Sequence, residues 1–251
     1  MPAGPIRAIE REALEDGGAR YLYYGEGCAI AARLTAPGSG SGPLVSATET
    51  TCFVVDGELA VDIEGATTVL GAGDVAWFPP GTPRRLTNPN ATDAVHLEIT
   101  APGLPSGSDD RPASTESSAR AFTRTPDLSA FSGTTFAQAW LVRREDGARS
   151  AQAYLADMPP HVSGPSLHYH EFDQFYFVLS GTLSVQVAME HHQAGPGSLV
   201  ALPARVPHAQ RNLGDLPERH LALLVPQPEF AHTPETPWDV AVELGPGELH
   251  L

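Results

Sequence analysis

The sequence predicts an all-β protein built from two copies of one structural unit. The first observation is an internal repeat, because Phe53 and His96 recur as Phe177 and His220, 124 positions further along. The second is composition: the chain has 24 Gly and 24 Pro, as expected for many short strands joined by turns. The third is patterning, since apolar residues from Tyr21 onward come in runs of strand length. Each copy is therefore expected to form a sheet-based unit.

The repeat needs no gap, and it preserves the residues that set backbone turns. Matching glycines and prolines indicate matching turns, because these two residues determine which backbone conformations are accessible. The matched pairs are Phe53 and Phe177, Val54 and Val178, Gly57 and Gly181, Leu59 and Leu183, Val61 and Val185, Gly71 and Gly195, Gly73 and Gly197, Pro79 and Pro203, Pro83 and Pro207, and Asn88 and Asn212. The spacing thus predicts the same strand order in both units.

The first unit is expected to cover residues 1–101. Residues 1–20 read as a short helical or extended lead-in without strong periodicity. A Pro-Gly-Ser-rich loop follows the next apolar run, over 37–43. The Asp56-Gly57 pair then separates two apolar stretches, which is a strong hairpin signal.

The remainder of the chain divides into a linker, a second unit and a tail. Residues 102–119 are dominated by Pro, Gly, Ser and charge, so we expect an exposed linker. The second unit spans 120–226, and a Pro-rich tail occupies 227–251. The prolines of the tail forbid a long helix, and Phe230 and Trp238 are expected to pack on a barrel or in a dimer interface.

Bulk composition excludes several classes of partner. The formal net charge of −15 over 251 residues argues against nucleic acid and anionic membranes. No apolar run reaches membrane-spanning length, and the start of the sequence lacks the features of a signal peptide. Two cysteines, Cys28 and Cys52, form no disulfide framework and match no metal spacing. We therefore expect a cytoplasmic protein that acts on a small molecule.

Four side chains of the second unit form a candidate metal site. His168 and His170 are two residues apart, so on a strand both imidazoles face the same side. Gln174 follows four residues later, and the next turn-rich stretch brings His208. Three imidazoles and one amide oxygen suit a borderline divalent metal. The alternative is that the two neighbouring histidines face solvent on an edge strand.

At these residues the sequence resembles the cupin superfamily. The first cupin motif is matched by Gly164, His168, His170, Gln174 and Gly181, and the second by Gly197, Pro203, His208 and Asn212. The first spacer is shortened, Gln174 replaces the usual glutamate, and Arg205 replaces the inner glycine of the second motif. The resemblance implies two double-stranded β-helix (jelly-roll) barrels, a bicupin. It also implies one divalent metal per chain, held by His168, His170, Gln174 and His208.

The repeat predicts that the first barrel lacks this site. The four ligand positions correspond to Leu44, Ser46, Thr50 and Arg84, none of which keeps the ligand type. The first barrel is therefore expected to serve as a structural or dimer-forming half, and we expect a homodimer. An alternative gives Arg84 an anion-binding role, since clefts commonly bind ligands.

The neutral ligand set leaves the charge of a divalent metal uncompensated, which favours an anionic substrate. Glutamine cannot act as a general base, so a base must come from elsewhere. Candidates are Tyr176, Tyr154, Glu171, Asp173 or a metal-bound hydroxide. Tyr176 shares the strand parity of Gln174, with simple core packing as its alternative, and Gln210 shares that of His208. We assign catalytic roles to Tyr176, Gln210 and Tyr154.

Three functions are compatible with this site. The favoured one is an Fe(II)-dependent dioxygenase that cleaves a small enolisable or phenolic substrate, since cupins with neutral histidine ligands support such chemistry. A non-redox isomerase or lyase acting on a keto or sugar acid is the second, by resemblance to cupins that act on unsaturated uronates. A non-catalytic small-molecule binder is the third. Ligand type alone leaves Mn, Ni, Co and Zn open beside iron.

Overall fold

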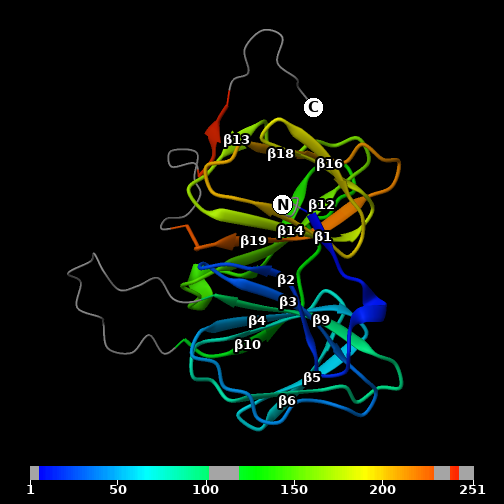
Figure 1. The fold of residues 1–251 in the computed structure, drawn as a ribbon, viewed down its shortest axis with the longest axis vertical. Coiled ribbons are helices and arrows are strands. Elements are labelled where there is room, and N and C mark those ends of the chain that lie inside the picture. The colour runs from blue at the N-terminus through cyan, green and yellow to red at the C-terminus, as the bar shows by residue number, and fades with distance from the viewer. Residues whose placement is uncertain (1–5, 102–118, 229–237, 243–251) are drawn as a thin grey trace, which may run out of the picture. The chain divides into compact units, whose positions relative to one another are not determined.

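The computed structural model describes residues 6–101, 119–228 and 238–242, and these residues are almost entirely β (Figure 1). They divide into two compact units. The upstream unit contains the described residues of Glu10–Pro126 and Leu141–Gln152, and the downstream unit those of Met1–Ile9, Asp127–Trp140 and Ala153–Leu251. The all-β fold predicted from the sequence is confirmed.

Two sheets form the upstream unit, with strand orders β10-β7-β4-β9-β3-β2 and β6-β5-β8. Its elements are the 3-10 helix η1 (Arg11–Ala13), β2 (Ala19–Tyr24), β3 (Ala29–Thr35), β4 (Glu49–Asp56), β5 (Glu58–Ile63), β6 (Ala66–Gly71), β7 (Val75–Phe78), β8 (Arg84–Thr87), β9 (Ala94–Ala101), β10 (Phe122–Arg124) and the 3-10 helix η2 (Arg144–Asp146). Apolar side chains of β4, β5, β7 and β9 fill the space between the sheets.

The downstream unit repeats this plan, with strand orders β1-β17-β14-β19-β12-β11 and β16-β15-β18-β13-β20. Its strands are β1 (Ile6–Ala8), β11 (Ala137–Val142), β12 (Gln152–Met158), β13 (His168–Tyr169), β14 (Asp173–Ser180), β15 (Leu183–Val187), β16 (Glu190–Ala194), β17 (Ser198–Leu202), β18 (His208–Arg211), β19 (Glu218–Val225) and β20 (Val240–Ala241). Side chains of β12, β14, β15, β17 and β19 form its core.

Strand register shows that the sequence repeat is a structural repeat. In the upstream unit β4 pairs with β9, with Val54 opposite His96 and an irregularity immediately after. In the downstream unit β14 pairs with β19, with Val178 opposite His220 and the same irregularity. Equal register at an equal offset requires the same bend in both strands.

The matched glycines mark turns where a side chain cannot fit. Gly57 joins β4 to β5, as the Asp-Gly signal predicts, and has φ of +76°. Gly181 has φ of +73° at the equivalent turn. A Cβ on either residue would lie 2.5 Å from a backbone carbonyl oxygen, that of Asp93 or of Pro217. Both the left-handed backbone and the lack of space therefore select glycine.

Two short segments pair with strands of the other unit from the one that the sequence boundaries suggest. Residues 6–8, expected with the first barrel, form β1 and pair with β17 of the downstream unit. Residues 122–124, expected with the second barrel, form β10 and pair with β7. The local sequence pattern does not say which sheet a flanking segment joins. The sheets that contain β7 and β17 each have an open edge, and either edge can pair with an extended segment. The expected linker at 102–119 and Phe230 lie outside the described residues, apart from Ala119.

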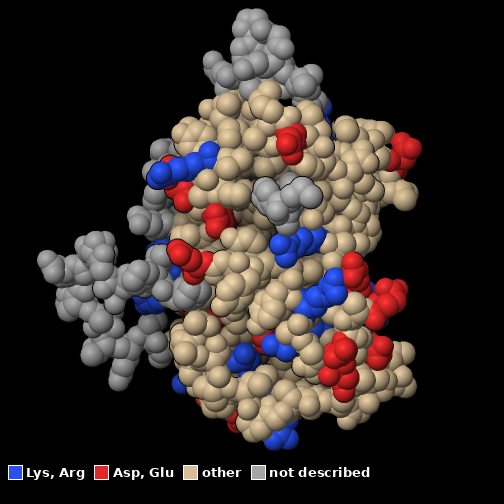
Figure 2. All heavy atoms as spheres, viewed as in Figure 1, with Lys and Arg blue, Asp and Glu red and all other residues tan. Residues whose placement is uncertain are grey.

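Among the described residues, none belongs to a helix long and apolar enough to cross a membrane. Cys28 and Cys52 are both buried, and neither forms a disulfide. On the face drawn in Figure 2, acidic and basic side chains are interspersed. That face carries no continuous field of one sign among its described residues.

Candidate metal centre

Two neighbouring strands and a third bring the four predicted ligands together. His168 begins β13, His170 follows that strand, and His208 begins β18. The two strands are antiparallel, with His168 directly opposite His208. Gln174 projects from β14, in the other sheet. All four side chains are buried, so the solvent-facing alternative for the two neighbouring histidines is wrong.

The three imidazoles converge on one point. One ring nitrogen from each of His168, His170 and His208 lies within 4.8 Å of the others. The ring centroids of His168 and His208 are 4.5 Å apart, and those of His170 and His208 are 4.8 Å apart. Such a cluster of neutral nitrogen donors is suited to a divalent transition metal. A group of three histidines that could hold a metal is therefore present.

Backbone carbonyl groups determine which ring nitrogen each histidine offers. His168 Nδ1 donates to the Ser166 carbonyl oxygen at 2.6 Å, and His208 Nδ1 donates to that of Val206 at 3.0 Å. His170 Nδ1 donates to the Phe172 carbonyl oxygen at 2.8 Å. A carbonyl oxygen only accepts, so each Nδ1 carries the proton and each Nε2 keeps its lone pair. Metal-binding histidines are commonly oriented in this way.

Two further observations test whether these residues fit a metal. His208 Nε2 is buried and has no hydrogen-bond partner. Such an orphaned acceptor is costly unless something binds it. Gln174 Nε2 donates to the Tyr154 hydroxyl at 3.1 Å, which turns its Oε1 toward His170 Nε2, 2.9 Å away. Two lone pairs thus face each other, and a cation would satisfy both. The residues present fit a metal.

Burial favours the neutral form of two of the imidazoles, those of His170 and His208. Desolvation lowers the pKa of His208 to about 3. Burial also lowers the pKa of His170, against the opposing effect of its contact with Gln174. Neutral imidazole is the form that binds metals, so at neutral pH both side chains are ready to act as ligands without first losing a proton.

A cavity of about 310 Å³ opens beside the cluster. Six of the described residues that line it are Phe, Tyr or Trp, most of the others are polar, and none is Lys or Arg. The lining residues are Phe136, Gln138, Trp140, Tyr154, Pro165, His168, His170, Phe172, Gln174, Tyr176, Gln210, Leu224, Trp238 and Asp239. Such a lining suits a planar molecule that also carries polar groups.

All three residues with predicted catalytic roles line this cavity. Burial raises the pKa of Tyr154, and burial also raises that of Tyr176 well above its ordinary value. Both hydroxyl groups therefore stay protonated at neutral pH and are suited to donating hydrogen bonds rather than to accepting a proton. The Gln210 Oε1 atom is buried without a partner, so it is available to a ligand.

The two carboxylates considered as bases, Glu171 and Asp173, do not line the cavity. Glu171 forms an exposed ion pair with Arg205 at 2.6 Å. Asp173 accepts a hydrogen bond from the Ala204 backbone N–H at 2.8 Å. Asp173 thus holds the loop that precedes His208, whereas the exposed Glu171 pair is screened by water and worth little.

The structure adds one acidic residue that the sequence patterns miss. Asp239, in the C-terminal tail, lines the cavity, and its Oδ1 lies 3.7 Å from His168 Nε2. Its negative charge contributes to the raised pKa of Tyr154, after burial. The neighbouring Trp238 packs against the barrel core, as expected for the tail. The expected packing of Trp238 could have pointed to Asp239. If Trp238 packs on the barrel, the next residue in the chain must lie near the same cavity wall.

The upstream unit has a different arrangement at the equivalent positions. Leu44 and Arg84 exchange backbone hydrogen bonds, at the positions where His168 and His208 stand opposite each other in the downstream unit. The Arg84 guanidinium is buried 4.8 Å from the Phe78 ring centroid and donates to the Thr50 hydroxyl at 3.5 Å. Within the described ranges, the histidine group of the downstream unit is the one cluster suited to a metal.

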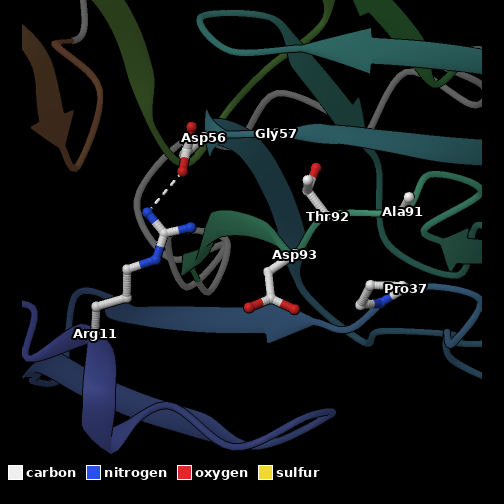
Figure 3. Close-up of a pocket in the computed structure, with 7 residues that line it drawn as sticks. All are labelled: Arg11, Pro37, Asp56, Gly57, Ala91, Thr92 and Asp93. Carbon is white, nitrogen blue, oxygen red and sulfur yellow. Dashed lines mark hydrogen bonds and ion pairs between the residues drawn. The ribbon is translucent and has the colours of Figure 1, made fainter.

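A second hollow lies on the surface of the upstream unit (Figure 3). Arg11 points across it to Asp56, and the two side chains form an ion pair at 2.6 Å. Both partners are about half exposed, so the pair is screened by water and worth little. Asp93 and Thr92 line the same hollow without a buried reactive group, so it offers no chemistry comparable to the histidine cluster.

Comparison with known proteins supports the family assignment. A family model for the cupin domain matches residues 34–100 and 154–223, more than half of the chain. One match falls in each unit, so fold and site together define a two-barrel cupin with a candidate metal centre in the downstream barrel. The chain belongs to the cupin family. None of the curated proteins matches it in sequence.

Several solved structures share this fold. A glyoxylate-induced protein from Pseudomonas aeruginosa is 19% identical, over 90% of this chain and 82% of its own, with a TM-score of 0.67. Ylba from E. coli is 14% identical, over 91% and 93%, with a TM-score of 0.70. A variant of oxalate decarboxylase from Bacillus subtilis is 16% identical, over 96% and 80%, with a TM-score of 0.67. At such low identity the likeness shows the fold alone.

Proposed function

We propose that the protein is a mononuclear metal enzyme, an Fe(II)-dependent dioxygenase that cleaves a small enolisable or phenolic substrate. The observation that carries this proposal is the pairing of a neutral donor cluster with an aromatic cavity. His168, His170 and Gln174 belong to both, because they face the cluster and line the cavity. A substrate in the cavity would therefore meet the metal-binding atoms.

His168, His170, His208 and the amide oxygen of Gln174 are the residues that would hold the metal. When bound, Fe(II) would supply a Lewis acid and a site for O2. The four donors carry no charge, so they leave the positive charge of the metal to be balanced by groups outside the ligand set, among them the substrate. An enolate or phenolate is the kind of anion that such a centre favours.

The protein itself would orient the substrate. Rings of Phe136 and Trp140 offer flat apolar surface to a planar substrate, and Gln210 Oε1 offers an acceptor for a substrate hydroxyl. The metal would itself neutralise the carboxylate of a sugar acid, so the preference between the two substrate classes rests on the flat rings of the lining. The lining thus supports an aromatic or enolic substrate over a uronate.

The test is metal analysis combined with oxygen uptake. Protein purified anaerobically, without chelators or a metal-affinity tag, is expected to contain about one iron per chain, because the upstream unit offers no equivalent site among its described residues. It is expected to consume O2 with diketones or catechols. Zinc, nickel or manganese, with turnover unaffected by removing oxygen, would favour the isomerase or lyase instead. Tight ligand retention without turnover would favour a binding protein.

Replacing Gly164 by alanine tests the role of Gln210 in this activity. An added Cβ would lie 2.7 Å from Gln210 Nε2, so the amide must move. Gln210 is not among the proposed ligands, so metal content is expected to be unchanged while turnover falls by up to about 100-fold. The matched control is Gly195→Ala, because a Cβ there has no heavy atom within 4 Å. Equal turnover in the two variants would exclude an orienting role for Gln210.

A further inference from the structure

The cavity has a single carboxylate among its described lining residues, that of Asp239. Its Oδ1 lies 3.7 Å from His168 Nε2, which is too long for a hydrogen bond. The contact therefore leaves the His168 lone pair available to a metal. Asp239 is also outside the group whose donor atoms all lie within 4.8 Å of one another. It is thus beside the three-histidine cluster rather than part of it.

Contacts on both sides of Asp239 hold it in place. On one side, β20 pairs with β13, and the Val242 backbone N–H donates to the Leu167 carbonyl oxygen at 2.9 Å. On the other, the Trp238 ring meets the Phe172 ring edge-on at 5.8 Å. The Phe172 ring in turn stacks on the imidazole of His170 at 3.9 Å. The tail is therefore attached to the same residues that form the metal centre.

The position of Asp239 matters because a metal at this site would lack a negatively charged ligand. Gln174 stands where the cupin motif has glutamate, so the four proposed ligands are neutral. A divalent cation among neutral donors at a largely buried site lacks a counter-charge, and such a charge is costly unless an anion lies near it. Asp239 is only about one-third exposed, so water screens its charge incompletely.

We propose that Asp239 is the anionic group of the metal centre. From outside the ligand set, its carboxylate offsets the positive charge of the cation held by His168, His170, His208 and Gln174, and so strengthens metal binding. The C-terminal tail thereby supplies the charge that the first cupin motif of this chain lacks. This inference rests on the proposed metal site but not on the reaction.

The experiment compares Asp239→Asn with Asp215→Asn. Both changes remove one carboxylate from the same unit at nearly constant shape, and Asp215 also contacts a histidine, His161, at 3.3 Å. Asp215 is fully exposed and forms no part of the cavity lining. The affinity of each variant for Mn(II) and for Zn(II) is measured by competition with a chromophoric chelator. Circular dichroism checks that each variant is folded.

Asp239→Asn is expected to weaken binding of both metals by about 10- to 100-fold, the usual effect of losing an outer-shell partner, while Asp215→Asn stays near wild type. Wild-type affinity in Asp239→Asn, or equal weakening in the two variants, overturns the inference. His208→Ala is measured alongside to distinguish failure of the Asp239 inference from failure of the proposed metal site. If His208→Ala also binds metal normally, the site itself is wrong.

Discussion

Replacing His208 by alanine is expected to remove metal binding. Its Nε2 atom is buried without a partner in the centre of the three-histidine group, so it is the donor with no alternative use in the protein. Loss of an outer-shell partner alone costs about 10- to 100-fold in metal affinity, and loss of a ligand should cost more than about 100-fold. Chelator competition measures this directly.

The same change should abolish metal-dependent stabilisation. For the wild-type protein, metal at about 100 times its dissociation constant raises the free energy of unfolding by about 2.7 kcal/mol, which a thermal shift detects. His208→Ala is expected to show no shift at that concentration. The matched control is His191→Ala, since His191 is exposed on β16 and is expected to leave the shift intact. A full shift in His208→Ala would contradict the ligand assignment.

Acidification is expected to destabilise the metal-free protein through His96, in the upstream unit. Neither ring nitrogen of this buried histidine has a hydrogen-bond partner, and burial lowers its pKa from 6.5 to about 4. Between these values the unfolded chain binds a proton that the folded chain does not, so stability falls as the pH falls. Above about pH 6.5 His96 is neutral in both the folded and the unfolded chain, so it causes no loss of stability there. The loss is about 1.4 kcal/mol per pH unit, or about 3 kcal/mol by pH 4.

His96→Leu tests this expectation, because it replaces the titrating imidazole by an apolar side chain of similar size. Urea unfolding of the chelator-treated protein is measured at pH 7, 6, 5 and 4. The variant is expected to lose about 3 kcal/mol less than the wild type over this range. His191→Leu serves as the control for loss of an exposed imidazole. Parallel pH curves for the wild type and His96→Leu would show that His96 does not titrate on unfolding.

Much of the fold could be predicted from the sequence because turns are local. Gly57 and Gly181 adopt left-handed backbone at equivalent hairpins, and glycine is the residue that this conformation selects. The Asn88 and Asn212 amides each donate to two backbone carbonyl groups in equivalent loops. Identical local restraints at one fixed offset give two similar barrels, which is why the repeat predicted the architecture.

Part of the site could be predicted for a similar reason. Strand alternation and the cupin motifs pointed to His168, His170 and His208, which the structure brings together. The sequence pattern also indicated that Tyr176 and Gln210 face the barrel interior, and both line the cavity. Their roles in metal binding and catalysis remain predictions for the experiments above.

The amino-acid sequence alone determined the two-barrel plan, the loss of the ligand set from the upstream barrel and the neutral character of the candidate centre. Only the tertiary structure decided that carbonyl groups orient the imidazoles and that Asp239 reaches the cavity. It also decided that residues 6–8 and 122–124 pair with strands that lie far away in the sequence. The physical reason is distance along the chain. Turns and strand parity act between neighbours, whereas edge pairing and tail docking depend on which surfaces the folded barrels leave open.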